Sequence, residues 1–331
     1  MAEESFNAYG KEEALALLFE DTGFSRAGNP SFEAEPGSSI VQASMVFVEG
    51  IDFDLTYFPL KHLGYKCAVA VAAGLYASTA HPRALSVRLS VSAKLDFTHV
   101  RDLWSGMVTA AKEHGFKALD LDMVPSPNGL TISVSAVGEE LKLTKGRTVS
   151  PRSKDLICVS GSLGAAYLGQ QVLEKGKSDF ERNSAQPDLE KYRMLIGSYL
   201  KPEVPSGIVD RLEEARIYPS GGYLVSHGLS DALKRLVRDT GLGAKVYADK
   251  IPFEGNSFAF GREMDIDPVS AAMNGGDDYR LLFVIPILSA EKFRREFQTF
   301  DIIGHMAQPE VGAVLVTPDG VELPVKAQGW E

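Results

Sequence analysis

The stretch VFVEGIDFDLTYFPLKHLGYKCAVAVAAGLYASTAHP, residues 46–82, decides the fold of this 331-residue chain. Its start, 46–48, predicts a short strand, and the largely apolar segment 61–76 predicts a buried helix. Just before it, residues 23–39 are rich in Gly, Pro and Ser and predict a loop, and 11–20 predicts a short helix. A buried helix that follows a strand indicates a domain of mixed α and β structure.

The residues that follow continue this pattern. Apolar and polar residues alternate over 84–92 and again over 130–136, which predicts two half-solvated strands. Between them, apolar residues recur at helical spacing over 98–115, and Gly115 is placed to end that helix. The first half is therefore expected to be an α+β domain.

The second half is also mixed. Residues 156–160 predict a strand, which leads through the turn 161–164 into a helix that starts near Ala165, whereas the charged stretch 176–190 predicts a loop. The remaining elements that we expect are helices at 191–200, 207–215, near Ser226 to Gly241 and 290–297, strands at 279–286 and 301–305, and a hairpin at 313–325.

The composition is that of a soluble globular protein, with 44% hydrophobic and 24% charged residues. The formal net charge of -10 argues against nucleic acid or an anionic membrane as the main partner, but permits a phosphorylated small molecule in a locally basic pocket. The sequence contains no run of about 18 apolar residues, so no membrane-spanning helix is predicted. The acidic, amphipathic start is unlike a signal peptide, and Cys67 and Cys158 lie in apolar runs as expected for buried thiols, so a cytoplasmic location is expected.

Several motifs, in a fixed order, connect the chain to a known family. They are Glu49–Gly50 with Phe53, the Gly64-Tyr65-Lys66 element and Pro82, then DLICVSGSLGAAYLG at 155–169, NGGDDYRLLF at 274–283, and the closing 302–304 and Gly329-Trp330. Together they resemble thiamine-monophosphate kinases of the aminoimidazole-ribonucleotide-synthetase-like superfamily, from about residue 46 to the end.

The resemblance implies an α+β fold of two synthetase-like domains. The expected N-terminal domain, 1–145, forms a dimerising sheet and carries the nucleotide and metal side, and the expected C-terminal domain, 146–331, is an α/β sandwich. A homodimer, a thiamine phosphate ligand, and ATP and Mg as cofactors are implied by the same resemblance.

The metal-binding segments of that family are largely without acids here. Its first glycine–aspartate–aspartate element corresponds to 23–27 (GFSRA), its Ser/Thr-Thr-Asp element to 43–45 (ASM), and its Asn-Leu-Ser-Asp element to 71–74 (VAAG). A kinase that joins two anionic molecules needs Mg²⁺ held on several carboxylates, and these side chains cannot supply them.

Two further segments keep part of the pattern. The Gly-Gly-Asp-Thr element reads DLDM at 120–123, so Asp122 is the one metal ligand that can be carried over, while Leu121 replaces a glycine that lets the backbone approach the nucleotide. The Asp-Ile-Ser-Asp-Gly-Leu element reads LVSHGL at 224–229, which keeps Ser226 on the cofactor side.

The substrate positions are better kept. Asp277 matches the acid that the family uses on the thiamine side, and Trp330 matches a terminal aromatic suited to stacking on a heteroaromatic cation. Asp52 stands where the family has a histidine on the substrate side. Arg147 is adjacent to the position of a connector arginine on the cofactor side.

Each candidate also has a structural interpretation. Asp122 fits a solvated turn before Pro125, Asp277 and Asp278 fit caps of a turn, and Trp330 fits a cover for the core. A further residue, His227 beside Gly228, fits a surface histidine at a helix start.

Two functions follow. The first is a thiamine-monophosphate-kinase-like pseudoenzyme that binds a ligand or partner, since the periodic apolar faces are intact while the metal ligands are not. The alternative is an active ATP- and Mg-dependent kinase with a metal site rebuilt around Asp122 from Asp120, Asp52 or Asp54. An enzyme with a new activity has no nucleophile–base pair in the sequence to support it.

Overall fold

The computed structural model describes residues 9–26, 31–140, 150–184, 187 and 189–326. Contacts divide the chain into an N-terminal unit, Met1–Leu141 with Pro205–Gly207, and a C-terminal unit, Lys142–Val204 with Ile208–Glu331. The predicted boundary at 145 and 146 falls outside the described residues and stays a prediction. No helix in the described part of the chain is long and apolar enough to cross a membrane.

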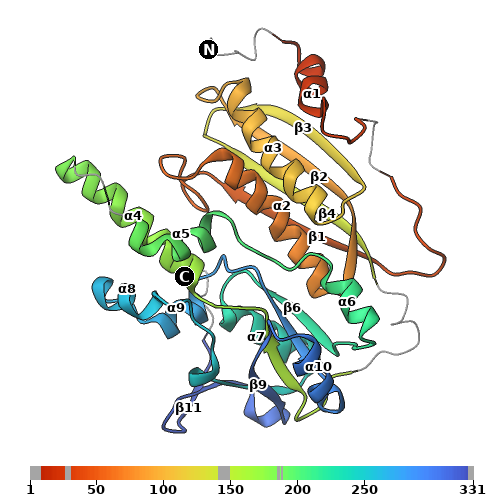
Figure 1. Ribbon diagram of the computed structural model, residues 1–331, viewed down its shortest axis with the longest axis vertical. Coiled ribbons are helices and arrows are strands. Elements are labelled where there is room, and N and C mark those ends of the chain that lie inside the picture. Colours follow the sequence, from red (N-terminus) through yellow and green to blue (C-terminus); the bar gives the residue numbers. More distant parts are fainter. Residues whose placement is uncertain (1–8, 27–30, 141–149, 185–186, 188, 327–331) are drawn as a thin grey trace. The chain divides into compact units, whose positions relative to one another are not determined.

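The N-terminal unit is a four-stranded sheet, in the order β1-β4-β2-β3, with two helices on one face (Figure 1). Strand β2 pairs antiparallel with β4 and parallel with β3, and β1 pairs antiparallel with β4. Its elements are α1 (Lys11–Phe19), β1 (Ile40–Val48), α2 (Leu60–Ala77), β2 (Ala80–Ser92), α3 (Phe97–Glu113), β3 (Ala118–Ser126) and β4 (Thr131–Glu140).

Hydrophobic periodicity explains this unit well. The apolar residues of β2 that were predicted to point one way, from Leu85 to Val91, are all buried, and fourteen of the eighteen residues of α2 are buried against α3 and the sheet. The helix α3 ends before Gly115, whose left-handed φ of 75° suits the residue after a helix. The predicted α+β fold is confirmed.

The C-terminal unit is built on a seven-stranded sheet in the order β11-β10-β7-β9-β5-β8-β6. All its strand pairs are antiparallel except β7 with β10. The strands are β5 (Leu156–Val159), β6 (Gly221–Val225), β7 (Gly243–Tyr247), β8 (Arg280–Ile285), β9 (Asp301–Ala307), β10 (Ala313–Val316) and β11 (Glu322–Pro324). The helices are α4 (Ala165–Asn183), α5 (Arg193–Leu200), α6 (Ile208–Glu214), α7 (Leu229–Thr240), α8 (Ser257–Met264), α9 (Pro268–Asn274) and α10 (Ala290–Glu296).

Two apolar clusters stabilise this unit. The larger joins the central strands to α7 and α9, and the smaller joins α4, α5, α8 and α9 around Leu168, Leu195 and Phe260. Cys158 is buried in β5, and burial raises the pKa of its thiol to about 12, so it is an inert core residue, as expected.

One predicted element of this unit is wrong. Residues 176–190 were predicted to be a loop, but α4 continues to Asn183 and ends at Ser184, which has a left-handed φ of 52°. Residues 176–183 contain lysine, glutamate and arginine, which have high helix propensity although they are charged, so this stretch extends the helix instead of ending it. The short strands β6 and β7 and the helices α8 and α9 were not predicted, and α7 begins at Leu229, after a turn that contains Ser226.

Candidate functional site

Asp120 and Asp122 lie on β3, the last strand in the order of the N-terminal sheet. Leu119 and Leu121 are buried, whereas Asp120 and Asp122 alternate with them and therefore lie on the other face. Pro125 belongs to the same strand, which is acceptable at a sheet edge because proline donates no ladder hydrogen bond. The structural interpretation of Asp122 as a turn residue is wrong, since it lies within the strand.

Both β3 carboxylates are paired with cations of the same chain. The Lys11 ammonium at the start of α1 lies 2.5 Å from Asp122 Oδ1, and the Met123 amide donates to the same oxygen at 2.8 Å. The hydrogen bond from Lys11 lowers the pKa of Asp122, so this carboxylate stays ionised. Asp120 is 2.6 Å from the Arg88 guanidinium on the neighbouring strand β2.

The other acids proposed for a rebuilt metal site lie elsewhere. Asp52 accepts a hydrogen bond from the Val48 amide, and Asp54 accepts one from the Thr56 amide, both at 2.7 Å, so each carboxylate stabilises its own turn. In the part of the chain that the structure describes, Asp52, Asp54, Asp120 and Asp122 do not bring three ligand atoms within 4.8 Å of one another. These residues do not fit a magnesium site.

Two of the segments without acids contact each other. Gly74 of α2 faces Ala43 of β1, and a Cβ added to Gly74 would lie 2.9 Å from the Ala43 Cβ. Atoms at that separation clash, so a larger residue at position 74 requires the strand to shift. The structure therefore brings these two segments together, but the space that a carboxylate at position 74 needs is closed.

Two of the predicted site residues, Ser226 from the cofactor side and Asp277 from the substrate side, lie together in the C-terminal unit. Ser226 follows β6, and its carbonyl accepts a hydrogen bond from the Asp277 amide at 2.8 Å, because β6 and β8 are paired up to Val225 and Arg280. The Ser226 hydroxyl lies 3.0 Å from His227 Nδ1. The structure thus brings together Ser226 and Asp277, which are 51 positions apart. His227 is exposed just before α7, as its structural interpretation predicted.

The loop that carries Asp277 has an unusual backbone. Gly276, Asp277 and Tyr279 have left-handed φ angles of 86°, 63° and 48°. Such a conformation costs a residue other than glycine about 1–2 kcal/mol. The Tyr279 hydroxyl donates to Asp277 Oδ1 at 2.9 Å, which fixes the direction of this carboxylate.

Asp278, next to it, has a structural role. Its carboxylate is buried and accepts hydrogen bonds from the Gly164 amide at 2.7 Å and the Ala166 amide at 3.2 Å, so it caps the start of α4. Burial raises the pKa of Asp278 to about 6, in spite of these two hydrogen bonds. Asp278 is thus a cap, as its structural interpretation held, but of a distant helix and not of its own turn.

Comparison with known proteins agrees with this arrangement. Residues 27–139 match the family model of the AIR synthase related protein, N-terminal domain. The thiamine-monophosphate kinase of Aquifex aeolicus is 24% identical over 73% of this chain and 74% of its own, and that of Synechococcus elongatus is 25% identical over 86% and 84%. A solved structure described as AaThiL complexed with AMPPCP and TMP superposes with a TM-score of 0.73 at 21% identity, over 100% of this chain and 99% of that one.

The chain is similar to thiamine-monophosphate kinases over most of its length, and part of its N-terminal unit matches the AIR synthase related family. Its fold is that of the AIR synthase-like superfamily.

The residue after Tyr279 is also charged. The Arg280 guanidinium donates to the carbonyls of Ser162 at 3.3 Å and Glu203 at 2.6 Å. Burial lowers the pKa of Arg280, and the nearby Asp278 opposes this. The arginine therefore links the turn after β5 to the segment after α5, and sequence reasoning missed it because both partners are backbone atoms.

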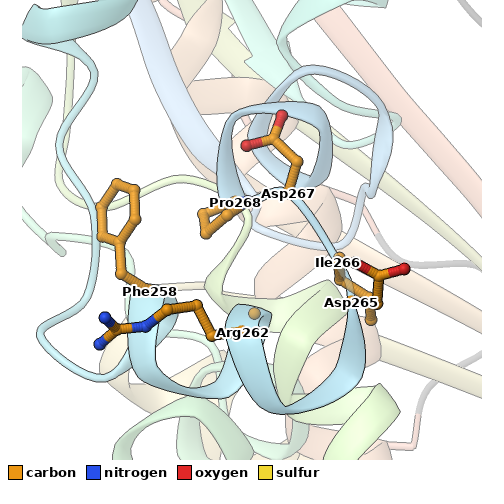
Figure 2. A pocket seen from close by; sticks show the side chains of 7 residues that line it. Phe258, Arg262, Asp265, Ile266, Asp267 and Pro268 are labelled. Carbon is orange, nitrogen blue, oxygen red and sulfur yellow. The ribbon is translucent and has the colours of Figure 1, made fainter.

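Each unit carries a depression that is defined by its lining residues. The first, of about 490 Å³, lies between α8 and α9, and Figure 2 shows Phe258, Arg262 and Asp267 around it. The second, of about 670 Å³, lies in the N-terminal unit between the start of α1 and the ends of β2 and β3, and Lys11 lines it. None of the predicted site residues lines either depression. Arg147 and Trp330 lie outside the described residues.

Proposed function

We propose that this relative of the thiamine-monophosphate kinases binds a thiamine phosphate or a similar ligand without transferring a phosphoryl group to it. The observation that carries the proposal is the ion pair of Lys11 with Asp122, the one metal ligand of the family that the sequence retains. An ammonium group of the chain itself takes the place at this carboxylate that the family gives to a metal cation.

The chemistry of the reaction supports this conclusion. Transfer from ATP to a monophosphate brings two anions together, and a metal held on several carboxylates normally offsets their repulsion. Here four of the five metal segments carry no acid at the matching position, and position 74 lacks the room for one. Loss of several such ligands together is expected to nearly abolish the rate.

The substrate side supports retained binding. Asp277 is held by Tyr279 and by the Ser226 carbonyl, and a fixed carboxylate suits a cationic ring. A related structure contains AMPPCP and TMP, which supports an ancestral site for a nucleotide and a thiamine phosphate. Contacts of Arg147, Asp52 and Trp330 with these ligands stay predictions.

The alternative is an active kinase with a rearranged metal site. It requires Asp52, Asp54 or Asp120 to meet Asp122 at one cation. Because these carboxylates bind Lys11, Arg88 and backbone amides of their own turns, we favour the binding protein.

We further propose a cytoplasmic homodimer that uses the open face of the N-terminal sheet. Ile40 and Val46 of β1 are 52% and 56% exposed, and they alternate with residues that face α2, so they lie on the face without helices. Sedimentation equilibrium of the wild type and of Val46→Lys tests the dimer. A monomeric wild type contradicts it.

Binding is tested by thermal unfolding with thiamine monophosphate alone, with ATP alone, with ATP and Mg²⁺, and without any ligand. We expect thiamine monophosphate to raise the Tm of the wild type and not of Asp277→Asn, with Asp249→Asn, at an exposed position of the same unit, as the matched control. Stabilisation by ATP that depends on Mg²⁺ and is lost in Asp122→Asn supports the alternative. No response to either ligand contradicts the proposed binding function.

A further inference from the structure

We propose that Tyr279 is a positioning residue, which holds the Asp277 carboxylate in the orientation that receives the cationic ring of the ligand. The inference rests on the proposed function and adds to it a residue that acts through Asp277.

The contact between the two side chains is direct. The Tyr279 hydroxyl donates to Asp277 Oδ1 at 2.9 Å, and Tyr279 is only 2% exposed, whereas Asp277 is half-buried. A buried aromatic ring has little freedom, so its hydroxyl is a fixed donor. A carboxylate that accepts from a fixed donor has its plane set before the ligand arrives.

The backbone of residues 276–279 also has to be held in place by hydrogen bonds. Asp277 and Tyr279 both have left-handed φ angles, and the residue before them, Gly276, has one as well. Residues other than glycine stay in this region when the surrounding structure over-determines them, and such residues gather at binding sites. Here three hydrogen bonds hold the segment: Asp277 to the Ser226 carbonyl, and Asp278 to two amides at the start of α4.

Within residues 276–279, the residues that hold the backbone in place therefore differ from the residue that is proposed to meet the ligand. Asp278 is fully committed to α4, and Tyr279 is buried with its hydroxyl on Asp277. Asp277 is the member of the segment that combines a charge with partial exposure. A carboxylate in this position selects a cationic group and disfavours an anionic one, so the thiazolium side of a thiamine phosphate fits it better than the phosphate side.

The test is a double-mutant cycle of ligand binding by titration calorimetry. The proteins are the wild type, Tyr279→Phe, Asp277→Asn and the double variant. Tyr247→Phe is the matched control. Tyr247 belongs to β7, its ring stacks on His305, and β7 is not a neighbour of β6 or β8 in the sheet. The probes are thiamine monophosphate and thiamine, which share the cationic ring and differ in the phosphate.

Tyr279→Phe keeps the ring and removes one hydrogen bond to a charged group. We expect this substitution to weaken the binding of both probes by the same factor, roughly tenfold. Once Asp277 is asparagine, the second substitution should have little further effect, because Tyr279 acts through that carboxylate. Tyr247→Phe should bind as the wild type does.

The outcomes separate this inference from the function on which it rests. A wild type that binds neither probe overturns both. A wild type that binds, together with Tyr279→Phe of equal affinity, overturns the positioning role alone. Additive effects in the double variant also overturn it, since they mean that Tyr279 supports the fold and not the carboxylate.

Discussion

Replacing Asp278 by asparagine is expected to change how the stability of the C-terminal unit depends on pH. This carboxylate is buried at the start of α4, and its pKa is raised from 3.8 to about 6. A carboxyl group with a higher pKa in the folded protein stabilises the fold when it is protonated. Its contribution is therefore full below pH 3.8 and is lost as the pH rises through about 6.

The size of the effect follows from the two pKa values. Their difference corresponds to about 3 kcal/mol between full protonation and full ionisation, at 1.36 kcal/mol for each pKa unit. Between pH 7 and pH 5 the linkage relation gives about 1.4 kcal/mol of added stability. Asparagine does not titrate, so Asp278→Asn should lack this increment, whatever its stability at pH 7.

The assay is hydrogen exchange of peptides that cover β5 and α4, in the wild type and in Asp278→Asn, at pH 5 and pH 7. The difference between the two proteins in the free energy of opening should change by about 1.4 kcal/mol between the two pH values. Other titrating groups are shared and cancel, and Asp249→Asn, at an exposed position, controls for the loss of a charge. A difference that is the same at both pH values refutes the reasoning.

Further predictions concern Gly164, His114 and Lys11. Gly164→Ala should destabilise the C-terminal unit by roughly 2–4 kcal/mol in urea unfolding, because φ is 75° and the new Cβ would lie 2.7 Å from the Ala272 amide, while Gly255→Ala, in open space, should be near neutral. Burial lowers the pKa of His114 in the folded protein. Its contribution to stability is therefore present above pH 6.5 and is lost as the pH falls through the lower pKa of the folded state. Hydrogen exchange of α3 should show this loss in the wild type and not in His114→Gln. Lys11→Met should raise the pKa of Asp122 toward 3.8 in a carboxyl NMR titration and change stability by less than about 1 kcal/mol, since the pair is largely exposed; an unchanged pKa would show that Lys11 does not hold this carboxylate.

Periodicity predicted the elements that bury one clear face. The helix α3 and the strands β2 and β4 were expected at close to their observed positions because their apolar residues recur at 3.6 or 2 positions, and α2 was expected from its largely apolar run. The strand β6 begins with two glycines and has only five residues, so it carries too little pattern to be recognised. The end of α4 was missed because its last turns are solvated and polar.

The site was predictable in part. Family motifs indicated Asp122, Ser226 and Asp277, but spacing along the chain could not show that Lys11 pairs with the first or that the other two meet. Asp278 illustrates the reason: its partners, Gly164 and Ala166, are more than one hundred positions away, so the cap exists only in the folded chain. Arg280 was missed for the same reason, since it acts through a hydrogen bond to Ser162, whereas Tyr279 contacts a near neighbour in sequence, Asp277, and was missed because the pattern does not show where its hydroxyl points.

The most direct test of the central claim is the formation of thiamine diphosphate from thiamine monophosphate, ATP and Mg²⁺, measured for the wild type and for Asp122→Asn, both shown by circular dichroism to be folded. We expect no product above the level without protein from either. Product that the wild type makes and Asp122→Asn does not would contradict the claim, because Asp122 would then hold a metal and not only Lys11.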